Sequence, residues 1–306
     1  MSRLPVRSRI YQNHHFDSTR WDYFAARESD IIVAASYKAG TTWTQAIVAH
    51  LLFPDGDLPA SVGETSPWLD MRTFPLEVVL KGLEAQQHRR FIKTHLPLDG
   101  LPYDARLRYL YVSRDARDVF MSLWNHYTRH VEEAFDIFNR TPGRRGDEFP
   151  RPPDDIHDFW RGWMTRGWFD WETDGWPYWS HLYNVQSWWD HRDLPNIQLI
   201  HFADMKEDLE REVRRIAAFL DIDVPMRNLS RIVSAVSFDE MKKRAERYAP
   251  GGGAHWEGGA RSFLHRGTNG RWRDVLSEQE IALYDAACER TLTPECRHWM
   301  ENGGPV

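Results

Sequence analysis

The chain has 306 residues and is 42% hydrophobic, which is enough to bury a sizeable core, and we expect a single domain over residues 1–306. Its net charge of −6 argues against a nucleic-acid-binding surface, although it leaves room for one local cationic pocket. No run approaches ~20 consecutive apolar residues, and the basic N-terminal segment lacks the apolar core of a signal peptide. These features predict a cytoplasmic protein without a membrane span.

Strand-like and helical patterns alternate along the chain, which predicts an α/β fold with a central, mostly parallel sheet flanked by helices. Two of the four strand candidates, the first and the third, are nearly continuous apolar runs, as in strands that are buried on both faces of a parallel sheet. The four candidates are 30–36, 89–95, 107–114 and 196–202.

Helical patterns follow most of these strands. Asp115 is a suitable N-cap, Ser237 and Ser277 each begin a Ser-x-x-Glu capping box, and Asp204 and Glu207 have the spacing of a capping pair. The predicted helices cover 41–53, 115–130, 204–220, 237–248 and 277–292.

Two irregular segments, 131–180 and 249–270, interrupt this alternation. The first is rich in proline and tryptophan and the second in glycine. Long segments of this kind inside a compact domain are usually functional, so we predict lids or loops there. The tryptophans of 160–189 have two open interpretations: they form a wall for an apolar ligand, or they are core residues.

The segment SYKAGTTW, residues 36–43, has the features of an anion-binding turn. Gly40 lets the backbone approach an anion closely, and Thr41 and Thr42 lie where the free amides of a helix start point outward. Lys38 precedes the glycine, whereas the lysine of G-x-x-x-x-G-K-[ST] follows it and the next hydroxyl holds magnesium. We therefore expect a phosphate group without a metal ion. The alternative is an ordinary strand-to-helix turn with a solvated lysine.

Further polar residues follow the second strand. Lys93 and His95 come at its end, and ligand sites in open parallel sheets lie just beyond the carboxyl ends of the strands. We expect both side chains to converge with Lys38 on one crevice. The alternative for His95 is a hydrogen-bonded loop histidine.

The end of the third strand is a second candidate for phosphate binding. Arg114 ends that strand, and Ser122 lies about two turns into the next helix, so a guanidinium and a hydroxyl can meet one phosphate. The alternatives are a salt bridge from Arg114 to Asp115 or Asp118, and simple packing for Ser122.

Four segments, in this order, resemble the cytosolic-type sulfotransferases that use 3′-phosphoadenosine 5′-phosphosulfate (PAPS). YKAGTTW is similar to the family's 5′-phosphosulfate loop, KTHLP to the segment with its catalytic histidine, RDARDVFMS to its 3′-phosphate motif, and HRGTNGRW to its late RKGxxGxW loop. Together they span residues 36–272. The resemblance implies a P-loop-like, three-layer fold.

The resemblance also implies roles for individual residues. His95 is the base that prepares an acceptor hydroxyl for in-line attack on sulfur, Lys38 stabilises the leaving oxygen, and Lys93 supports the sulfuryl oxygens. Four of the implied PAPS-binding residues, Trp43, Phe202, Phe238 and Met241, lie near the adenine. The full implied set is Lys38, Ala39, Gly40, Thr41, Thr42, Trp43, Arg114, Ser122, Phe202, Phe238, Met241, His265, Arg266 and Gly267.

The expected acceptor is a small molecule with a hydroxyl, apolar or aromatic in character. We expect residues 63–80 to face it, because they join the anion-binding turn to the second strand. A P-loop kinase and a non-catalytic nucleotide-binding module are the competing interpretations. A homodimer is an open alternative to a monomer.

Overall fold

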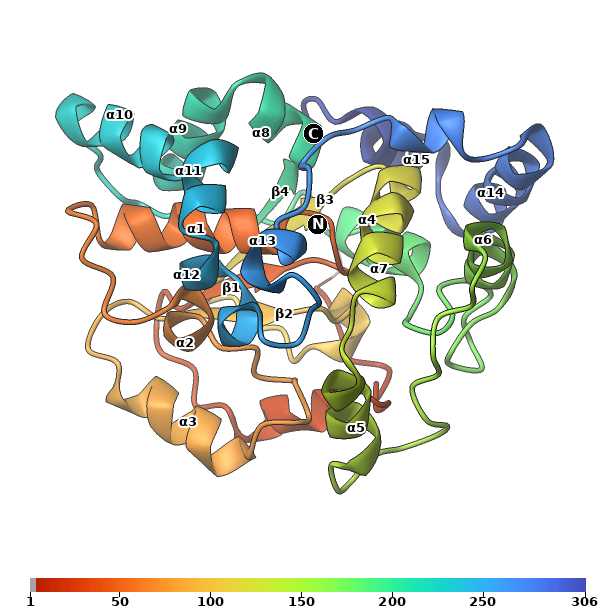
Figure 1. Ribbon diagram of the computed structural model, residues 1–306. Helices are drawn as coiled ribbons and strands as arrows, with labels where there is room; N and C mark the ends of the chain where they lie inside the picture. Colours follow the sequence, from red (N-terminus) through yellow and green to blue (C-terminus); the bar gives the residue numbers. More distant parts are fainter. Residues whose placement is uncertain (1–3) are drawn as a thin grey trace.

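Four parallel strands form the central sheet, in the order β2–β1–β3–β4 (Figure 1). The structure is a computed structural model and describes residues 4–306. Each strand lies within a predicted segment, which confirms the α/β class with a parallel sheet and flanking helices, although the observed strands are shorter than predicted. Their bounds are β1 Ile31–Ala34, β2 Phe91–Thr94, β3 Arg108–Ser113 and β4 Ile197–His201.

Strand β1 lies in the middle of the sheet. Its first residue, Ile31, is paired with Phe91 of β2 on one side and with Arg108 of β3 on the other. All four residues of β1 are buried, as expected for a strand covered on both faces. The chain leaves β1 toward β2 and later returns to the opposite side for β3, and ligands bind beyond the carboxyl ends of strands at such a reversal.

Two groups of helices flank the sheet in Figure 1. On the left, α1 (Thr41–Leu52) packs with α9 (Leu209–Phe219) and α10 (Met226–Ala235). On the right, α14 (Glu278–Thr291) packs with α6 (Ile156–Thr165) and α7 (His181–Trp189), and α15 (Pro294–Asn302) also packs on α7. The other α-helices are α2 Val62–Thr65, α3 Leu76–Ala85, α4 Ala116–Thr128, α5 Glu132–Arg140, α8 Phe202–Glu207, α11 Phe238–Lys243, α12 Ala245–Tyr248 and α13 Gly259–Phe263.

Two predicted helices are each divided into two. The predicted helix 204–220 breaks at Asp208, whose side chain accepts a hydrogen bond from the Arg211 amide and caps α9. The predicted capping pair of Asp204 and Glu207 is wrong, because His201 caps α8 and Asp204 accepts a hydrogen bond from the Gly304 amide instead. A side chain that bonds to nearby backbone competes with helix continuation. The predicted helix 237–248 likewise divides into α11 and α12.

Asp115 caps α4 by accepting from the Arg117 amide, and Ser277 forms a reciprocal capping box with Glu280 at the start of α14, as predicted. The predicted box at Ser237 is only half formed: Ser237 accepts from the Glu240 amide, but the Glu240 carboxylate pairs with Lys243 instead. None of the helices within residues 4–306 is both long and apolar enough to cross a lipid bilayer.

The two irregular segments contain some regular structure. Helices α5 and α6 lie within 131–180, and α13 lies within 249–270. The side chains of three tryptophans in 160–189 are almost fully buried, namely Trp160, Trp163 and Trp188, so these belong to the core. Trp179 is also buried but contributes to a cavity described below.

A buried ion pair joins the starts of β1 and β2. Asp30 precedes β1 and is 2% exposed, and Arg90 precedes β2 and is 1% exposed. The Arg90 Nε donates to Asp30 Oδ1 at 2.9 Å, and its Nη2 also donates to the Ala25 carbonyl at 2.8 Å. This pair joins β1 to the edge strand β2 at the end opposite to the ligand crevice.

We predict that Asp30→Asn lowers the free energy of unfolding by about 3 kcal/mol, because it leaves a buried guanidinium without its counter-charge. Glu210→Gln is the control. It breaks an exposed pair with Arg214 on α9 and should cost under about 1 kcal/mol. Chemical denaturation of both variants measures the difference, and equal losses would show that burial of the first pair is unimportant.

Candidate functional site

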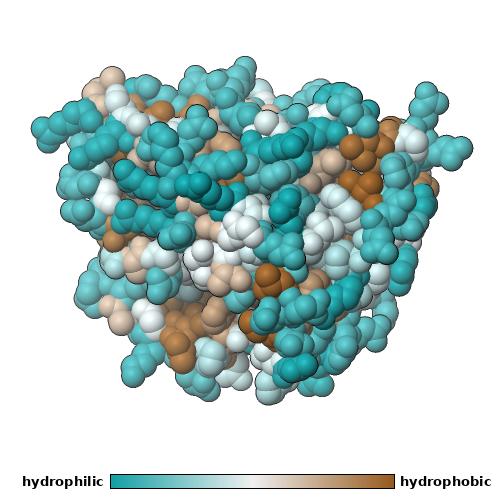
Figure 2. Space-filling view, viewed as in Figure 1, coloured by the Kyte–Doolittle hydropathy of each residue, from teal (hydrophilic) through white to brown (hydrophobic). Residues whose placement is uncertain are grey.

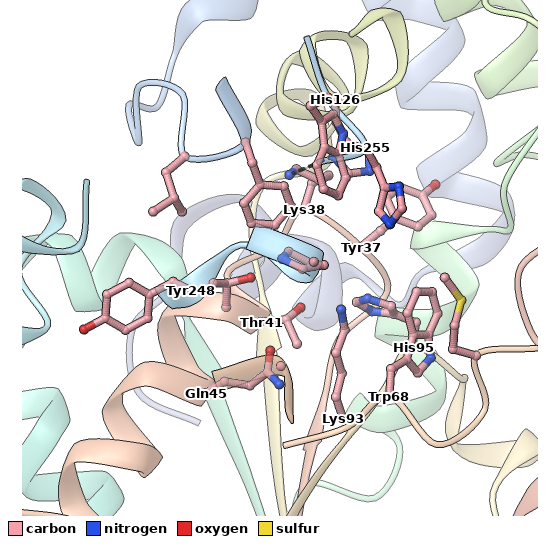
Figure 3. Close-up of a pocket in the computed structure, with 18 of the residues that line it drawn as sticks. Tyr37, Lys38, Thr41, Gln45, Trp68, Lys93, His95, His126, Tyr248 and His255 are labelled. Atoms are coloured by element: carbon pink, nitrogen blue, oxygen red, sulfur yellow. Dashed lines mark hydrogen bonds between the residues drawn. The ribbon is translucent and has the colours of Figure 1, made fainter. Parts of the chain in front are cut away.

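A cavity of about 1130 Å³ lies at the carboxyl ends of the strands. Residues that follow all four strands line it: Lys38 after β1, His95 after β2, Arg114 after β3 and Phe202 after β4. Its volume is slightly above the usual range for ligand pockets, about 300–1,000 Å³, and is large enough for two substrates. Figure 3 shows Lys93 next to His95, and Lys38 pointing toward His126 in another part of the cavity.

The cavity brings together nearly all of the residues proposed from the sequence. The exception is Ala39, whose side chain is fully buried and does not line the cavity. The lining includes Lys38, Gly40, Thr41, Thr42, Trp43, Lys93, His95, Arg114, Ser122, Phe202, Phe238, Met241, His265, Arg266 and Gly267.

The turn before α1 has the features of an anion site. Gly40 has φ +122°, and a Cβ there would lie 3.2 Å from the side chains of Phe202 and Val112, so only glycine fits without strain. The Thr41 Oγ1 is buried and has no hydrogen-bond partner among the described residues. The first amides of α1 are also free of helical partners. An anion at this turn would satisfy these donors.

Lys38 is partly buried and lines the cavity. Its Nζ is 3.3 Å from the His126 Nδ1 and 4.3 Å from the centre of the Phe263 ring (Figure 3). Burial lowers the pKa of Lys38 to about 7, and repulsion from Lys93 and Arg114 adds to this effect. The contact with His126 was not foreseen, because a lone histidine on α4 carries no sequence signal that relates it to a loop 88 residues away.

His95 has the hydrogen-bond arrangement of a base. Its Nδ1 is 2.8 Å from the Ala35 carbonyl, which can only accept, so Nδ1 carries the proton and Nε2 keeps a free lone pair. Burial, and then the positive charge of Lys93, lower the pKa of His95 well below its ordinary value of 6.5. The imidazole is therefore neutral near pH 7 and able to accept a proton.

Lys93 projects from β2 beside His95. Its Nζ lies 4.6 Å from the centre of the Trp68 ring, and burial lowers its pKa to about 8. The Trp68 ring in turn stands edge-on to His95, with ring centres 4.6 Å apart. Trp68 thus contacts both Lys93 and His95 and holds them in place. Among the described residues, no carboxylate lies within ion-pair distance of either Lys93 or Lys38.

Arg114 does not pair with either of its neighbouring carboxylates. Its Nη2 donates to the Thr268 carbonyl and to the Asn269 Oδ1, both at 2.8 Å, and its guanidinium stacks 4.2 Å from the centre of the Phe202 ring. Asp115, the first alternative partner, pairs with Arg117 instead. Burial lowers the pKa of Arg114 to about 10. This guanidinium therefore lies under the late loop formed by residues 265–271.

The late loop packs tightly on the aromatic side of the cavity. A Cβ on Gly267 would lie 2.7 Å from the Phe238 ring, so that ring packs directly on the glycine backbone. Trp43 lies in the same region and donates from Nε1 to the Val236 carbonyl at 2.8 Å. Its ring meets Phe202 edge-on at 5.3 Å. These rings form a flat apolar pocket suited to a purine base.

Arg271 is a cavity residue that the sequence interpretation missed. It lines the cavity, and its Nε is buried without a partner among residues 4–306. Burial, and then the charge of Arg266, lower the pKa of Arg271. The sequence did carry a signal for assigning Arg271 to the site, because it lies in the HRGTNGRW motif, five residues after Arg266.

The cavity is cationic although the whole chain is acidic. Five cations line it, against only two carboxylates, Glu64 and Glu246. The cations are Lys38, Lys93, Arg114, Arg266 and Arg271. Such a set of cations matches a ligand with several negative charges. The cations lie in two places, at the α1 turn and under the late loop, and so match a ligand with two separate anionic groups.

A family model for the sulfotransferase domain matches residues 28–297, which contain every site residue described above. The chain belongs to the sulfotransferase family. This assignment confirms the resemblance based on the four sequence motifs.

Known relatives agree with this assignment. The chain is 33% identical to a glycolipid sulfotransferase of Mycobacterium bovis over 99% of this chain and 97% of that one. It is 26% identical to rat sulfotransferase 1A1, over 88% of this chain and 87% of that one.

Solved structures share the fold. A mouse sulfotransferase complexed with PAP matches with a TM-score of 0.67 and 20% identity, over 92% of this chain and 91% of that one. A retinol dehydratase in complex with androsterone and PAP also matches with a TM-score of 0.67, at 22% identity over 90% of this chain and 84% of that one.

We predict that one lysine of this sulfotransferase titrates near pH 7, because burial disfavours the charged form of Lys38. NMR of the reductively methylated protein should show one such resonance, and Lys38→Arg should remove it. The unfolded chain, with an ordinary lysine pKa of 10.5, binds more protons than the folded one between about pH 7 and 10. The free energy of unfolding of the native protein should therefore rise with pH across this window more steeply than that of Lys38→Met. Equal pH dependence in the two proteins would show that the pKa of Lys38 is not lowered.

Proposed function

We propose that this sulfotransferase moves the sulfuryl group of PAPS to a hydroxyl of a small, apolar or aromatic acceptor, with His95 as the base. The observation that carries the proposal is the His95 Nε2, which is free to accept a proton and shares with Lys38 and Lys93 a cavity that has room for two substrates. A nucleotide-binding module without chemistry has no need of this imidazole.

The residues present fit PAPS as the donor. The α1 turn, with its unpartnered Thr41 Oγ1, would hold the 5′-phosphosulfate, and Arg114 and Arg271 would hold the 3′-phosphate. Trp43 and Phe238 would enclose the adenine. The solved neighbours whose titles name PAP support this assignment, since PAP is what PAPS becomes after it loses its sulfuryl group.

The side chains divide the chemistry among them. PAPS, when bound, supplies the sulfuryl group and a phosphate leaving group. The neutral His95 takes the acceptor proton at Nε2, and its Nδ1 bond to Ala35 holds the ring in the correct tautomer. Lys38 stabilises the charge that develops on the leaving oxygen, and Lys93 stabilises the sulfuryl oxygens. Burial of these lysines strengthens their effect, because the local dielectric constant is low.

Residues of 63–80 and Trp179 line the cavity, and we assign them to the acceptor side. Residues such as Trp68, Met71 and Val79 give it an apolar character. The relatives named as glycolipid sulfotransferases add lipid-linked sugars to the acceptors that deserve a test. Incubation with labelled PAPS and a panel of phenols, sterols, carbohydrates and lipid extracts tests the proposal directly, with ATP as the competing donor.

We predict that His95→Ala lowers the turnover number at least 100-fold while the dissociation constant for PAP stays within about threefold. Isothermal titration calorimetry and a sulfate-transfer assay give the two values. Loss of PAP binding in the same variant would indicate a structural histidine.

Lys38→Ala should likewise lower turnover far more than it weakens binding of PAP, because its charge acts on the leaving oxygen in the transition state. The control is Lys242→Ala, which removes a lysine that bonds the His265 carbonyl from outside the reaction centre. Normal turnover in the Lys38 variant would refute its role.

Binding of PAP should also take up protons at pH 8. The pKa of Lys38 is lowered to about 7 and that of Lys93 to about 8, and a bound anion favours their charged forms. Calorimetry in buffers with different ionisation enthalpies measures the uptake. It should fall in Lys38→Met, and zero uptake by the native protein would show that these lysines are already charged.

A further inference from the structure

One buried carboxylate beside the site takes no part in the proposed chemistry. Figure 2 shows hydrophilic residues over most of one face of the molecule, where water can solvate their charges. Asp70 is instead 0% exposed, and no lysine, arginine or histidine within residues 4–306 forms an ion pair with it. A buried charge is costly unless it is well hydrogen-bonded, so the donors around Asp70 indicate what it does.

Three neutral side chains donate hydrogen bonds to Asp70. The Trp68 Nε1 donates to Oδ1, and the Trp21 Nε1 and the Thr94 Oγ1 donate to Oδ2 at 2.7 Å and 2.5 Å. Trp21 lies in the 3₁₀-helix Ser18–Tyr23, Trp68 lies between α2 and α3, and Thr94 is the last residue of β2. One carboxylate therefore joins three separate parts of the chain.

The bond to Thr94 fixes the backbone on both sides of His95. The Leu96 amide donates to the Thr94 Oγ1 at 3.1 Å, so this hydroxyl closes the turn that carries His95. The same Oγ1 donates its own proton to Asp70. The bond from the His95 Nδ1 to the Ala35 carbonyl then orients the ring on this backbone. The position of the imidazole therefore depends on Asp70 through Thr94.

The bond to Trp68 fixes a ring that contacts both proposed catalytic side chains of β2 and its end. The Trp68 ring centre lies 4.6 Å from the Lys93 Nζ and 4.6 Å from the centre of the His95 ring (Figure 3). The Lys93 amide donates to the Pro67 carbonyl at 3.0 Å, and Trp68 forms a parallel β-bridge with Lys93. These contacts anchor the backbone of Trp68, and the bond from its Nε1 to Asp70 sets the direction of the ring.

The charge of Asp70 also acts on Lys93. Burial lowers the pKa of Lys93 to about 8, and the charge of Asp70 opposes this effect. Burial raises the pKa of Asp70 to about 6, while its three hydrogen bonds and the charge of Arg20 act the other way, so the carboxylate is ionised at pH 7. The other titratable neighbours of Lys93 are His95, which is neutral near pH 7, and Lys38, whose pKa is lowered by burial and then by Lys93. Asp70 therefore favours the charged form of Lys93, which the proposed mechanism needs.

We propose that Asp70 is a positioning residue for sulfuryl transfer, which holds His95 in place through Thr94 and Lys93 in place through Trp68. Its charge acts on Lys93 in addition to these contacts. The inference rests on the proposed roles of His95 and Lys93, and it adds a residue that does not line the cavity and so touches neither substrate. A purely structural bond would change only stability, whereas a positioning residue also changes kcat and the titration of Lys93.

Asp70→Asn tests this role, because it removes the charge and keeps the size of the side chain. NMR of the reductively methylated protein follows the titration of Lys93, and Lys93→Arg assigns the resonance. The midpoint should fall by about one pH unit in Asp70→Asn, because a nearby opposite charge is lost. The kcat for sulfate transfer should fall about 30-fold, since the catalytic groups lose their alignment, while the Kd for PAP stays within about threefold. An unchanged kcat would overturn the positioning role.

Asp30→Asn is the matched control, because it also removes the charge of a buried carboxylate, at the other end of the sheet. It should lower the free energy of unfolding, as predicted above, but leave kcat and the Lys93 titration unchanged at a temperature at which both variants are folded. An equal fall of kcat in the two variants would show that Asp70 acts through stability alone and would overturn the proposal.

Thr94→Val tests the link to His95 without changing a charge. Valine has nearly the shape of threonine but can neither donate to Asp70 nor accept from the Leu96 amide, so kcat should fall about tenfold with little change in KM. Thr94→Ser keeps the hydroxyl and should retain kcat within about threefold of the native value. A native kcat in Thr94→Val, or an equal fall in Thr94→Ser, would overturn the link.

The proposed function and the role of Asp70 fail in different ways. The Lys93 titration needs neither donor nor acceptor, so an unmoved midpoint in Asp70→Asn would refute the effect of Asp70 on Lys93 even if the native protein transfers sulfate. Absence of transfer from PAPS to every acceptor by the native protein, with PAP still bound, would instead refute the proposed function.

Discussion

The site depends on holding cationic side chains, without carboxylate partners, in a cavity at the carboxyl edge of a parallel sheet. Lys38 follows β1, Lys93 lies in β2 and Arg114 follows β3, and burial lowers the pKa of all three. An enclosed cation is costly unless an opposite charge is supplied. In this sulfotransferase the polyanionic donor would supply that charge. Binding of the donor would therefore offset the electrostatic cost of the unpaired cations.

The surrounding structure preserves this arrangement in several ways. The buried pair of Asp30 and Arg90 fixes the opposite end of β1 and β2, so that the residues after those strands stay in register. Gly40 lets the backbone turn beside Phe202 with no side chain in the way. The bond from His95 to Ala35 ties the imidazole to the neighbouring strand. Each of these groups is therefore held by rigid backbone, as precise positioning requires.

The part of the cavity that we propose for the acceptor is built differently. The irregular segments contribute Tyr178, Trp179 and Trp256 to it, and apolar side chains such as Val78 of α3 also line it. Since the cofactor side is set by the sheet edge, variation of these segments can change the acceptor without disturbing the donor site. This separation explains why family assignment fixes the reaction type more firmly than the acceptor.

The sequence by itself determined the parallel α/β class, the four strands and nearly every cavity residue of the donor side, because these depend on local patterns: apolar runs, a glycine before a helix, and polar residues at strand ends. It misjudged what depends on contacts between distant segments. The break at Asp208, the pairing of Arg114 with Asn269, the contact of Lys38 with His126 and the inward face of Arg271 all arise from packing. Likewise, only the tertiary structure separated the core tryptophans from Trp179 and brought the carboxylate of Asp70 to Trp21 and Thr94. Burial and hydrogen-bond pairing are properties of the assembled chain, and no local pattern encodes them.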